Sequence, residues 1–175
     1  MPEPESITPA RKWGAIAAAN LLLLFSYWSV LFASALAADE DAEVAAAPFF
    51  SLGVALVPFV FLLLAFLSHH RHAPWGVLRA MGLFIVVALP VSVFSQNPAA
   101  GLAAGFGAGG TVSLRANEED SLGARFGAVA VVTLYLLILG PLIPEAAALG
   151  GCVLALPALG IADAFSGYRQ ARESG

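Results

Sequence analysis

Charged residues and cysteines are both scarce in this chain. Of 175 residues, 11% are Asp, Glu, Lys or Arg, and one is a cysteine, Cys152. Ordinary soluble domains carry roughly 25% charged residues. Such a chain has too little polar surface to cover a globule in water, and one cysteine excludes a disulfide framework within a single chain. With 59% hydrophobic residues in long blocks and a mean hydropathy of +0.85, the composition is typical of a membrane protein.

Motifs of catalysis and nucleotide binding are missing as well. The sequence contains no H-E-x-x-H, G-x-S-x-G, C-x-x-C or Walker motif and no basic stripe for nucleic acid. The absence of these motifs favours a protein that is not an enzyme. It predicts no cofactor, no catalytic residues, no metal site and no nucleic-acid partner.

Six apolar segments predict an all-α fold, a polytopic integral membrane protein with one membrane domain over residues 1–175. The segments cover residues 13–37, 48–68, 74–95, 98–114, 121–140 and 145–165. The fourth has the minimum length for crossing a hydrocarbon core of about 30 Å. The fifth needs Arg125 within its length, with the side chain snorkelling to the headgroups. Pro48, Pro74 and Pro98 are expected at the first positions of their helices.

The basic residues predict the orientation. In a bundle of six transmembrane helices with the N-terminus inside, all eight Lys and Arg residues lie in inner segments. Because positive residues resist translocation, we expect both termini inside, in the cytoplasmic (inner) membrane of a bacterium. One alternative stays open. Residues 35–37, Ala-Leu-Ala, resemble a signal-peptidase site, and cleavage after Ala37 would leave five spans with the N-terminus outside.

Residues 105–110, GFGAGG, match the dinucleotide fingerprint G-x-G-x-x-G letter for letter. That fingerprint needs a preceding strand and a later acidic residue, and neither is present here. A helix explains the pattern better, because Gly101, Gly105 and Gly109 then form one stripe. Ala104 and Ala108 lie in the adjacent row. Small residues let helix backbones approach closely, so we expect this helix-packing stripe at the centre of the bundle.

Residues 99–114 also resemble the glycine- and alanine-rich pore helix of small-conductance mechanosensitive channels. The resemblance implies a conduit along this helix in an oligomer. That family continues from its pore helix into a soluble domain, whereas this chain has two further apolar segments.

A few polar residues are candidates for function. Asp163 lies near the inner end of the last segment, with Arg169 or Arg172 as its expected partner, and intramembrane ionisable groups are functional candidates by default. Asn20, in the first segment, is expected to make an interhelical hydrogen bond. His69 and His72 have a spacing that could suit a shared metal, although a polar turn at the inner membrane face explains them better. The acidic residues between positions 39 and 43 lack the spacing of a calcium loop.

Small-residue helix faces without recognisable chemistry predict a non-catalytic accessory or assembly subunit. Its partners would be the lipid bilayer and either another membrane protein or further copies of itself. The alternative function is an oligomeric channel or uncoupled carrier lined by helix 98–114. A weaker alternative is a lipid-handling membrane enzyme that uses Asp163.

Overall fold

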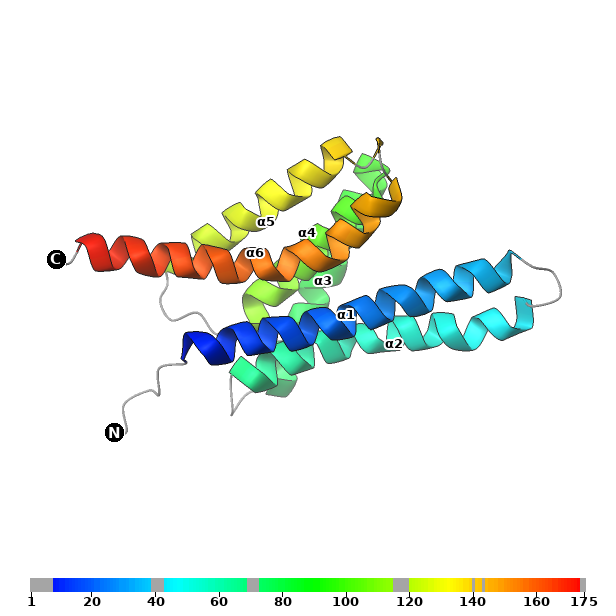
Figure 1. The fold of residues 1–175 in the computed structure, drawn as a ribbon, viewed down its shortest axis with the longest axis horizontal. Coiled ribbons are helices and arrows are strands. Elements are labelled where there is room, and N and C mark those ends of the chain that lie inside the picture. The colour runs from blue at the N-terminus through cyan, green and yellow to red at the C-terminus, as the bar shows by residue number, and fades with distance from the viewer. Residues whose placement is uncertain are drawn as a thin grey trace.

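The computed structural model describes residues 8–38, 43–68, 73–114, 120–139, 141–142 and 144–173, and these residues form six α-helices (Figure 1). The helices are α1 (Pro9–Ala37), α2 (Glu43–Ser68), α3 (Ala73–Ser95), α4 (Pro98–Ser113), α5 (Asp120–Leu139) and α6 (Pro144–Glu173). The all-α prediction is confirmed, and the six predicted segments correspond to the six helices in order. The helices at the two ends run further than the apolar segments 13–37 and 145–165, since α1 begins at Pro9 and α6 continues to Glu173.

Among the described residues, five helices are long and apolar enough to cross a membrane. The chain is therefore a multi-pass membrane protein by the length and composition of its helices. The exception is α4, whose 16 residues extend only about 24 Å at 1.5 Å per residue.

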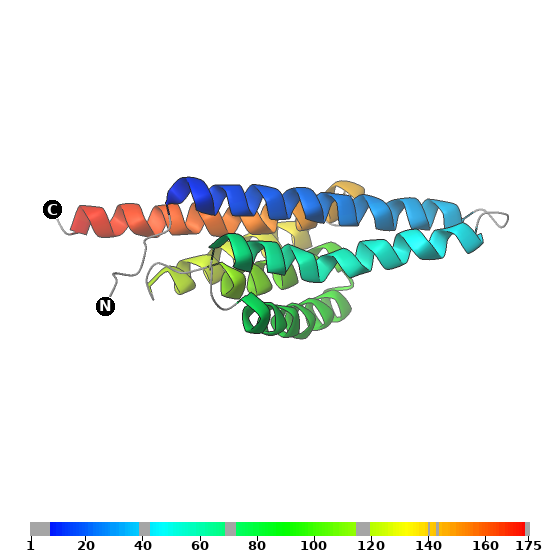
Figure 2. The same cartoon turned by 90° about the horizontal axis from the view of Figure 1, so that it is seen from below.

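The helices alternate in direction, with α3 and α4 inclined steeply to the α1–α2 hairpin, and α1 begins at the same end of the bundle at which α6 ends (Figures 1 and 2). Side-chain contacts at both ends join α1 and α2 into a hairpin. Phe32 near the end of α1 makes an edge-to-face contact with Phe49 near the start of α2. At the other end of this α1–α2 hairpin, Arg11 reaches the Leu67 carbonyl. At the end where α1 ends and α2 begins, the hairpin extends beyond the other four helices, whereas α6 reaches further at the opposite end (Figure 1).

The glycine-rich helix α4 lies at the centre of the bundle, and nearly all of its residues are buried. Its glycines face residues of α2, α3, α5 and α6. A Cβ built at Gly107 would lie 2.5 Å from Val129 of α5, and one at Gly110 would lie 2.8 Å from Leu159 of α6. Without side chains at these positions, α4 can pack against several helices at once.

The predicted stripe of Gly101, Gly105 and Gly109 faces mainly α3. At Gly101 the backbones approach closely, because an added Cβ would lie 2.7 Å from the Ala88 carbonyl oxygen. Aromatic rings occupy the space at the other two positions. An added Cβ would lie 2.8 Å from Phe84 at Gly105 and 2.6 Å from Phe61 at Gly109.

Three phenylalanine rings complete this contact. Phe61 of α2, Phe84 of α3 and Phe106 of α4 have centroid separations of 4.8 to 5.9 Å, within the range of favourable aromatic pairs. Phe61 and Phe106 are fully buried. The glycines of α4 therefore leave room for rings supplied by α2 and α3, which join three helices in one core.

Helix starts followed the sequence signals in part. Pro98 opens α4, and Oδ1 of the N-cap Asn97 accepts a hydrogen bond from the Ala100 amide at 3.2 Å. The same side chain donates from Nδ2 to the Leu136 carbonyl near the end of α5 at 3.0 Å. The expectation for Pro48 was wrong, because α2 begins at Glu43 and holds Pro48 inside. The preceding Glu and Ala residues are good helix formers that extend the helix forward.

We predict that Gly101→Ala lowers thermal stability in detergent although alanine is the better helix former. Overpacking a tight site costs about 1–3 kcal/mol, which outweighs a propensity gain of up to about 1 kcal/mol. Gly82→Ala is the matched control, since a Cβ there meets nothing within 4 Å and should raise the melting temperature. Equal shifts for the two variants would show that α3 and α4 do not pack at Gly101.

Candidate functional site

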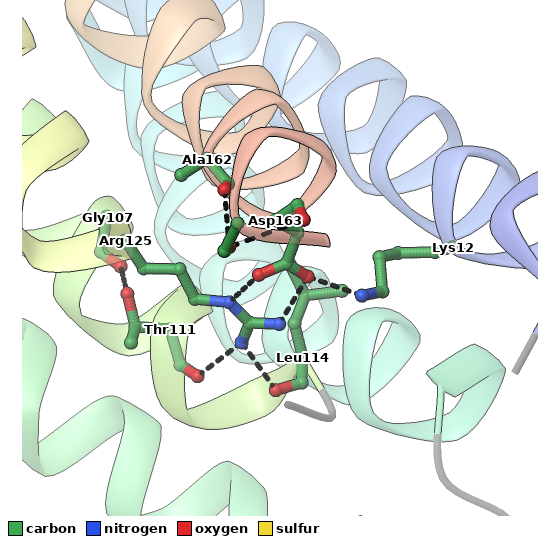
Figure 3. A network of polar contacts seen from close by, with 8 residues as sticks. Lys12, Gly107, Thr111, Leu114, Arg125, Ala162 and Asp163 are labelled. Atoms are coloured by element: carbon green, nitrogen blue, oxygen red, sulfur yellow. Dashed lines mark hydrogen bonds and ion pairs between the residues drawn. The ribbon is translucent and has the colours of Figure 1, made fainter. Parts of the chain in front are cut away.

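The most unusual feature inside the bundle is a buried cluster of three charged side chains around Asp163 of α6 (Figure 3). Arg125 of α5 donates from Nε to Oδ1 and from Nη2 to Oδ2, both at 2.5 Å. Lys12 of α1 donates from Nζ to Oδ2 of the same carboxylate. We call Lys12, Arg125 and Asp163 the ionic clamp, because they join three helices through one carboxylate.

Arg125 also joins the clamp to α4. Its Nη1 donates to the Leu114 carbonyl at 2.9 Å and to the Thr111 carbonyl at 3.1 Å (Figure 3). Carbonyls at the end of a helix lack intrahelical donors, and this end carries a partial charge of about −0.5. The clamp holds two cations and one anion, so the end of α4 partly offsets its excess positive charge.

Two sequence-based expectations about these charges were wrong. Arg125 does not snorkel outward, since its side chain is 0% exposed. Asp163 bonds with Lys12 and Arg125, whereas Arg169 and Arg172 had been expected because they are close in the sequence. Inside the bundle, Arg125 makes paired, charge-assisted hydrogen bonds with Asp163 and further bonds with the end of α4, and neither contact can be seen from neighbours in the sequence.

A second cation is placed at another helix end. Arg11 of α1 donates from Nε to the Leu67 carbonyl at 2.9 Å, and Leu67 is the penultimate residue of α2. Cations are favoured at helix C-termini. Two helices that end at this side of the bundle, α2 and α4, are thus each capped by an arginine from another helix.

Asn20 makes the interhelical bond on the opposite side of the α1–α6 contact. Its Nδ2 donates to the Val153 carbonyl of α6 at 3.1 Å. Val153 lies four residues before Pro157, which is inside α6 and has no N–H to give this carbonyl. The Asn20 amide therefore supplies the donor that Pro157 removes. Its Oδ1 is buried without a partner among the described residues.

Between these polar contacts, α1 and α6 pack through Gly160. A Cβ built there would lie 2.8 Å from both Ile16 and Trp13. The Lys12–Asp163 bond lies on one side of this contact and the Asn20–Val153 bond on the other. The α1–α6 interface is therefore fixed at three levels along its length.

The other predicted site residues lie apart from the clamp or outside the residues that the structure describes. Ala104 and Ala108 are buried in α4 beside the glycine stripe. His69 and His72 lie outside the described residues, as does most of the acidic stretch 39–43. Within the described ranges, His, Cys, Asp and Glu side chains form no group of three that could hold a metal ion.

Sequence reasoning missed Lys12 and Arg125 as site residues, although a signal was present. Lys12 is the only lysine of the chain, and Arg125 is needed to give the fifth segment its length. Together with Asp163, they are charges at the same ends of three apolar segments. Only the packing of α1, α5 and α6 shows that these ends converge on one carboxylate.

Comparisons of the chain with protein-family models, curated proteins and solved structures find no match. The hydrogen bonds of the clamp therefore indicate what its groups can do chemically. Both carboxylate oxygens of Asp163 accept from cations, and the Arg125 guanidinium contacts one carboxylate and two carbonyls. Each charged group of the clamp is thus bonded to another member of the clamp, and Arg125 is also bonded to the end of α4.

We predict that Asp163→Asn lowers the unfolding free energy by about 3–5 kcal/mol, because removing one partner leaves buried charge uncompensated. Adding Lys12→Met should recover part of this loss, since one of the two stranded cations is then gone. The exposed Arg172 gives the control Arg172→Gln, expected to change stability by less than about 1 kcal/mol. Additive losses in the double variant would contradict the clamp. Unfolding in detergent is measured for the wild type, Asp163→Asn, Lys12→Met, the double variant and Arg172→Gln.

A second prediction concerns Asn20 and Pro157. Asn20→Ala leaves the Val153 carbonyl without a donor, whereas Pro157→Ala restores its intrahelical donor. The cost of Asn20→Ala should therefore be smaller in the Pro157→Ala background, by about 0.6 kcal/mol, the average for hydrogen bonds between membrane helices. A double-mutant cycle in detergent measures this coupling. Equal costs in both backgrounds would mean that the amide does not compensate for the proline.

Proposed function

We propose that this chain is a non-catalytic accessory or assembly subunit of a membrane-protein complex. The observation that carries the proposal is the ionic clamp, in which charged groups inside the bundle bind one another and a helix end. Because the charged groups inside the bundle bind one another and hold its helices together, the bundle is suited to a rigid subunit that packs against other proteins. Its outward surface is apolar, with exposed Phe, Trp, Leu and Val on several helices.

The geometry gives less support to the two other functions. A conduit along α4 needs a face of that helix open to water, yet its glycines contact side chains of α2, α3, α5 and α6. A lipid-handling enzyme using Asp163 needs a carboxylate free to accept a proton or bind substrate. Both Asp163 oxygens already accept hydrogen bonds from Arg125 or Lys12.

We further propose six crossings of the cytoplasmic membrane with both termini inside. The alternation of helix directions supports an even number of crossings, and the positive-inside rule supports the orientation. Although α4 is short, its backbone is buried among other helices, and short helical segments are tolerated where protein surrounds them.

Topology can be measured with single cysteines after Cys152 is replaced. Cysteines at Ala38 and Gln96 should react with an impermeant thiol reagent on intact cells, because both lie at outer turns of the proposed threading. Cysteines at Glu118 and Arg172 should react only after permeabilisation. Labelling of Glu118→Cys in intact cells would mean that α4 does not cross.

The subunit proposal predicts a stable heteromeric complex. The chain, expressed at its native level and extracted in mild detergent, should elute with another integral membrane protein at fixed stoichiometry. Native mass spectrometry gives the composition. Asp163→Asn should weaken the complex together with the fold, whereas Arg172→Gln should leave both intact. A chain that elutes alone contradicts the proposal, and a homo-oligomer that conducts ions in planar bilayers supports the channel instead.

A further inference from the structure

The ionic clamp gives four helices a common reference level. Lys12, Arg125, Asp163 and the Leu114 carbonyl are joined by hydrogen bonds, so α1, α5, α6 and the end of α4 meet at one depth. From this level, the distance that each helix runs toward its other end can be compared. That other end is the outer one in the proposed threading.

The helices reach very different distances from the clamp. The first helix, α1, continues for about 25 residues to Ala37, or about 37 Å at 1.5 Å per residue. On the same scale, α4 extends about 24 Å to Pro98 and α5 about 21 Å from Arg125 to Leu139. The hairpin of α1 and α2 therefore runs well past the other helices, as Figures 1 and 2 show.

Contacts near the outer end of α4 give the same result. Gly151 of α6 faces the Ala99 carbonyl near the start of α4, and Val153, two residues further along α6, binds Asn20 of α1. The outer end of α4 is thus within about one helical turn of the level of Asn20. From Asn20, α1 continues for about 17 residues, or about 25 Å.

The surface changes from apolar to polar closer to the clamp on the α3–α4 side of the molecule than on the α1–α2 side. The turn between α3 and α4 contains Gln96, which is exposed and has a positive φ of 52°, followed by Asn97. In contrast, the outer half of the hairpin exposes apolar side chains on both of its helices: Phe25, Trp28, Phe32, Phe50 and Val54. Helix surface that is apolar on all sides is suited to hydrocarbon.

We propose that the lipid bilayer is the ligand of this stepped surface and that the protein thins the bilayer beside α3, α4 and α5. Hydrocarbon of ordinary thickness would cover the α1–α2 hairpin. On the other side, headgroups would descend to the turn at Gln96. Hydrophobic mismatch of this kind deforms the surrounding bilayer. The inference rests on the membrane crossing proposed above.

Tilting alone does not remove the step. Suppose that α4 lies along the membrane normal. To span the same depth as α4, α1 with its reach of about 37 Å would then need a tilt of about 50° from the normal, which is beyond the 0–40° range of transmembrane helices. The clamp and the Asn20–Val153 bond hold α1 and α6 together at two separate levels. They oppose a rotation of the hairpin that would bring the outer ends into line.

Tryptophan fluorescence can test the step. The chain has three tryptophans, Trp13, Trp28 and Trp75, and all of them are exposed. One variant keeps only Trp28. A second has Phe94→Trp as its only tryptophan, because Phe94 is 89% exposed at the end of α3, two residues before Gln96. A variant with only Trp13, next to Lys12, calibrates the inner interface.

Each variant is reconstituted in phosphatidylcholine vesicles with bromines at different acyl-chain depths. The stepped surface predicts the strongest quenching of Trp28 by deep bromines and of Phe94→Trp by bromines near the headgroups. Bilayer thickness from X-ray scattering should also fall as the protein-to-lipid ratio rises. A Trp28 that bromines do not quench would place the hairpin outside the bilayer and overturn the proposal. Deep quenching of Phe94→Trp would overturn it too, because the turn would then lie in hydrocarbon of full thickness.

These results are separable from the subunit proposal. A chain that purifies alone contradicts the proposed function but leaves the quenching pattern unchanged. Uniform depths at the two positions contradict the thinning and leave the complex untouched.

Discussion

The bundle depends on one carboxylate. Asp163 lies inside an apolar helical protein, where an unpaired charge costs several kcal/mol, and Lys12 and Arg125 supply the opposite charge from two other helices. Arg125 extends the bonding to the end of α4. Because each member needs the others, α1, α4, α5 and α6 can pack together at one relative depth only. We infer that the clamp fixes this register more than it adds net stability, since buried ion pairs are often no more stabilising than apolar contacts.

Other polar contacts in the bundle follow the same logic, in which one helix completes what another leaves unsatisfied. Arg11 supplies a donor to the end of α2, Asn97 joins the start of α4 to the end of α5, and Asn20 supplies the donor that Pro157 cannot. The glycines of α4 likewise leave space that side chains of other helices fill, namely those of Phe61, Phe84, Val129 and Leu159. The central helix, weak by itself because glycine is a poor helix former, is therefore held on several sides.

The sequence was sufficient for the helices and their order, because apolar blocks separated by polar or proline-containing stretches are a strong signal. It also indicated the glycine stripe, since the spacing of Gly101, Gly105 and Gly109 defines one helix face. Which neighbour fills that face depends on tertiary packing and was not accessible. The site was recognised only through Asp163. Its partners lie 38 and 151 residues away in the chain, and the expectation of a nearby arginine reflects the bias of sequence reasoning toward local pairs.

Because Lys12 is the only lysine, the central claim can be tested without ambiguity in the assignment. Protein labelled with 15N at lysine Nζ and 13C at the aspartate carboxyl carbons is reconstituted in lipid bilayers for solid-state NMR. We expect a strong dipolar contact between Nζ and one aspartate carboxyl carbon, and we expect the contact to vanish in Asp163→Asn. A folded protein whose lysine shows no contact with any aspartate would contradict the ionic clamp and the register that depends on it.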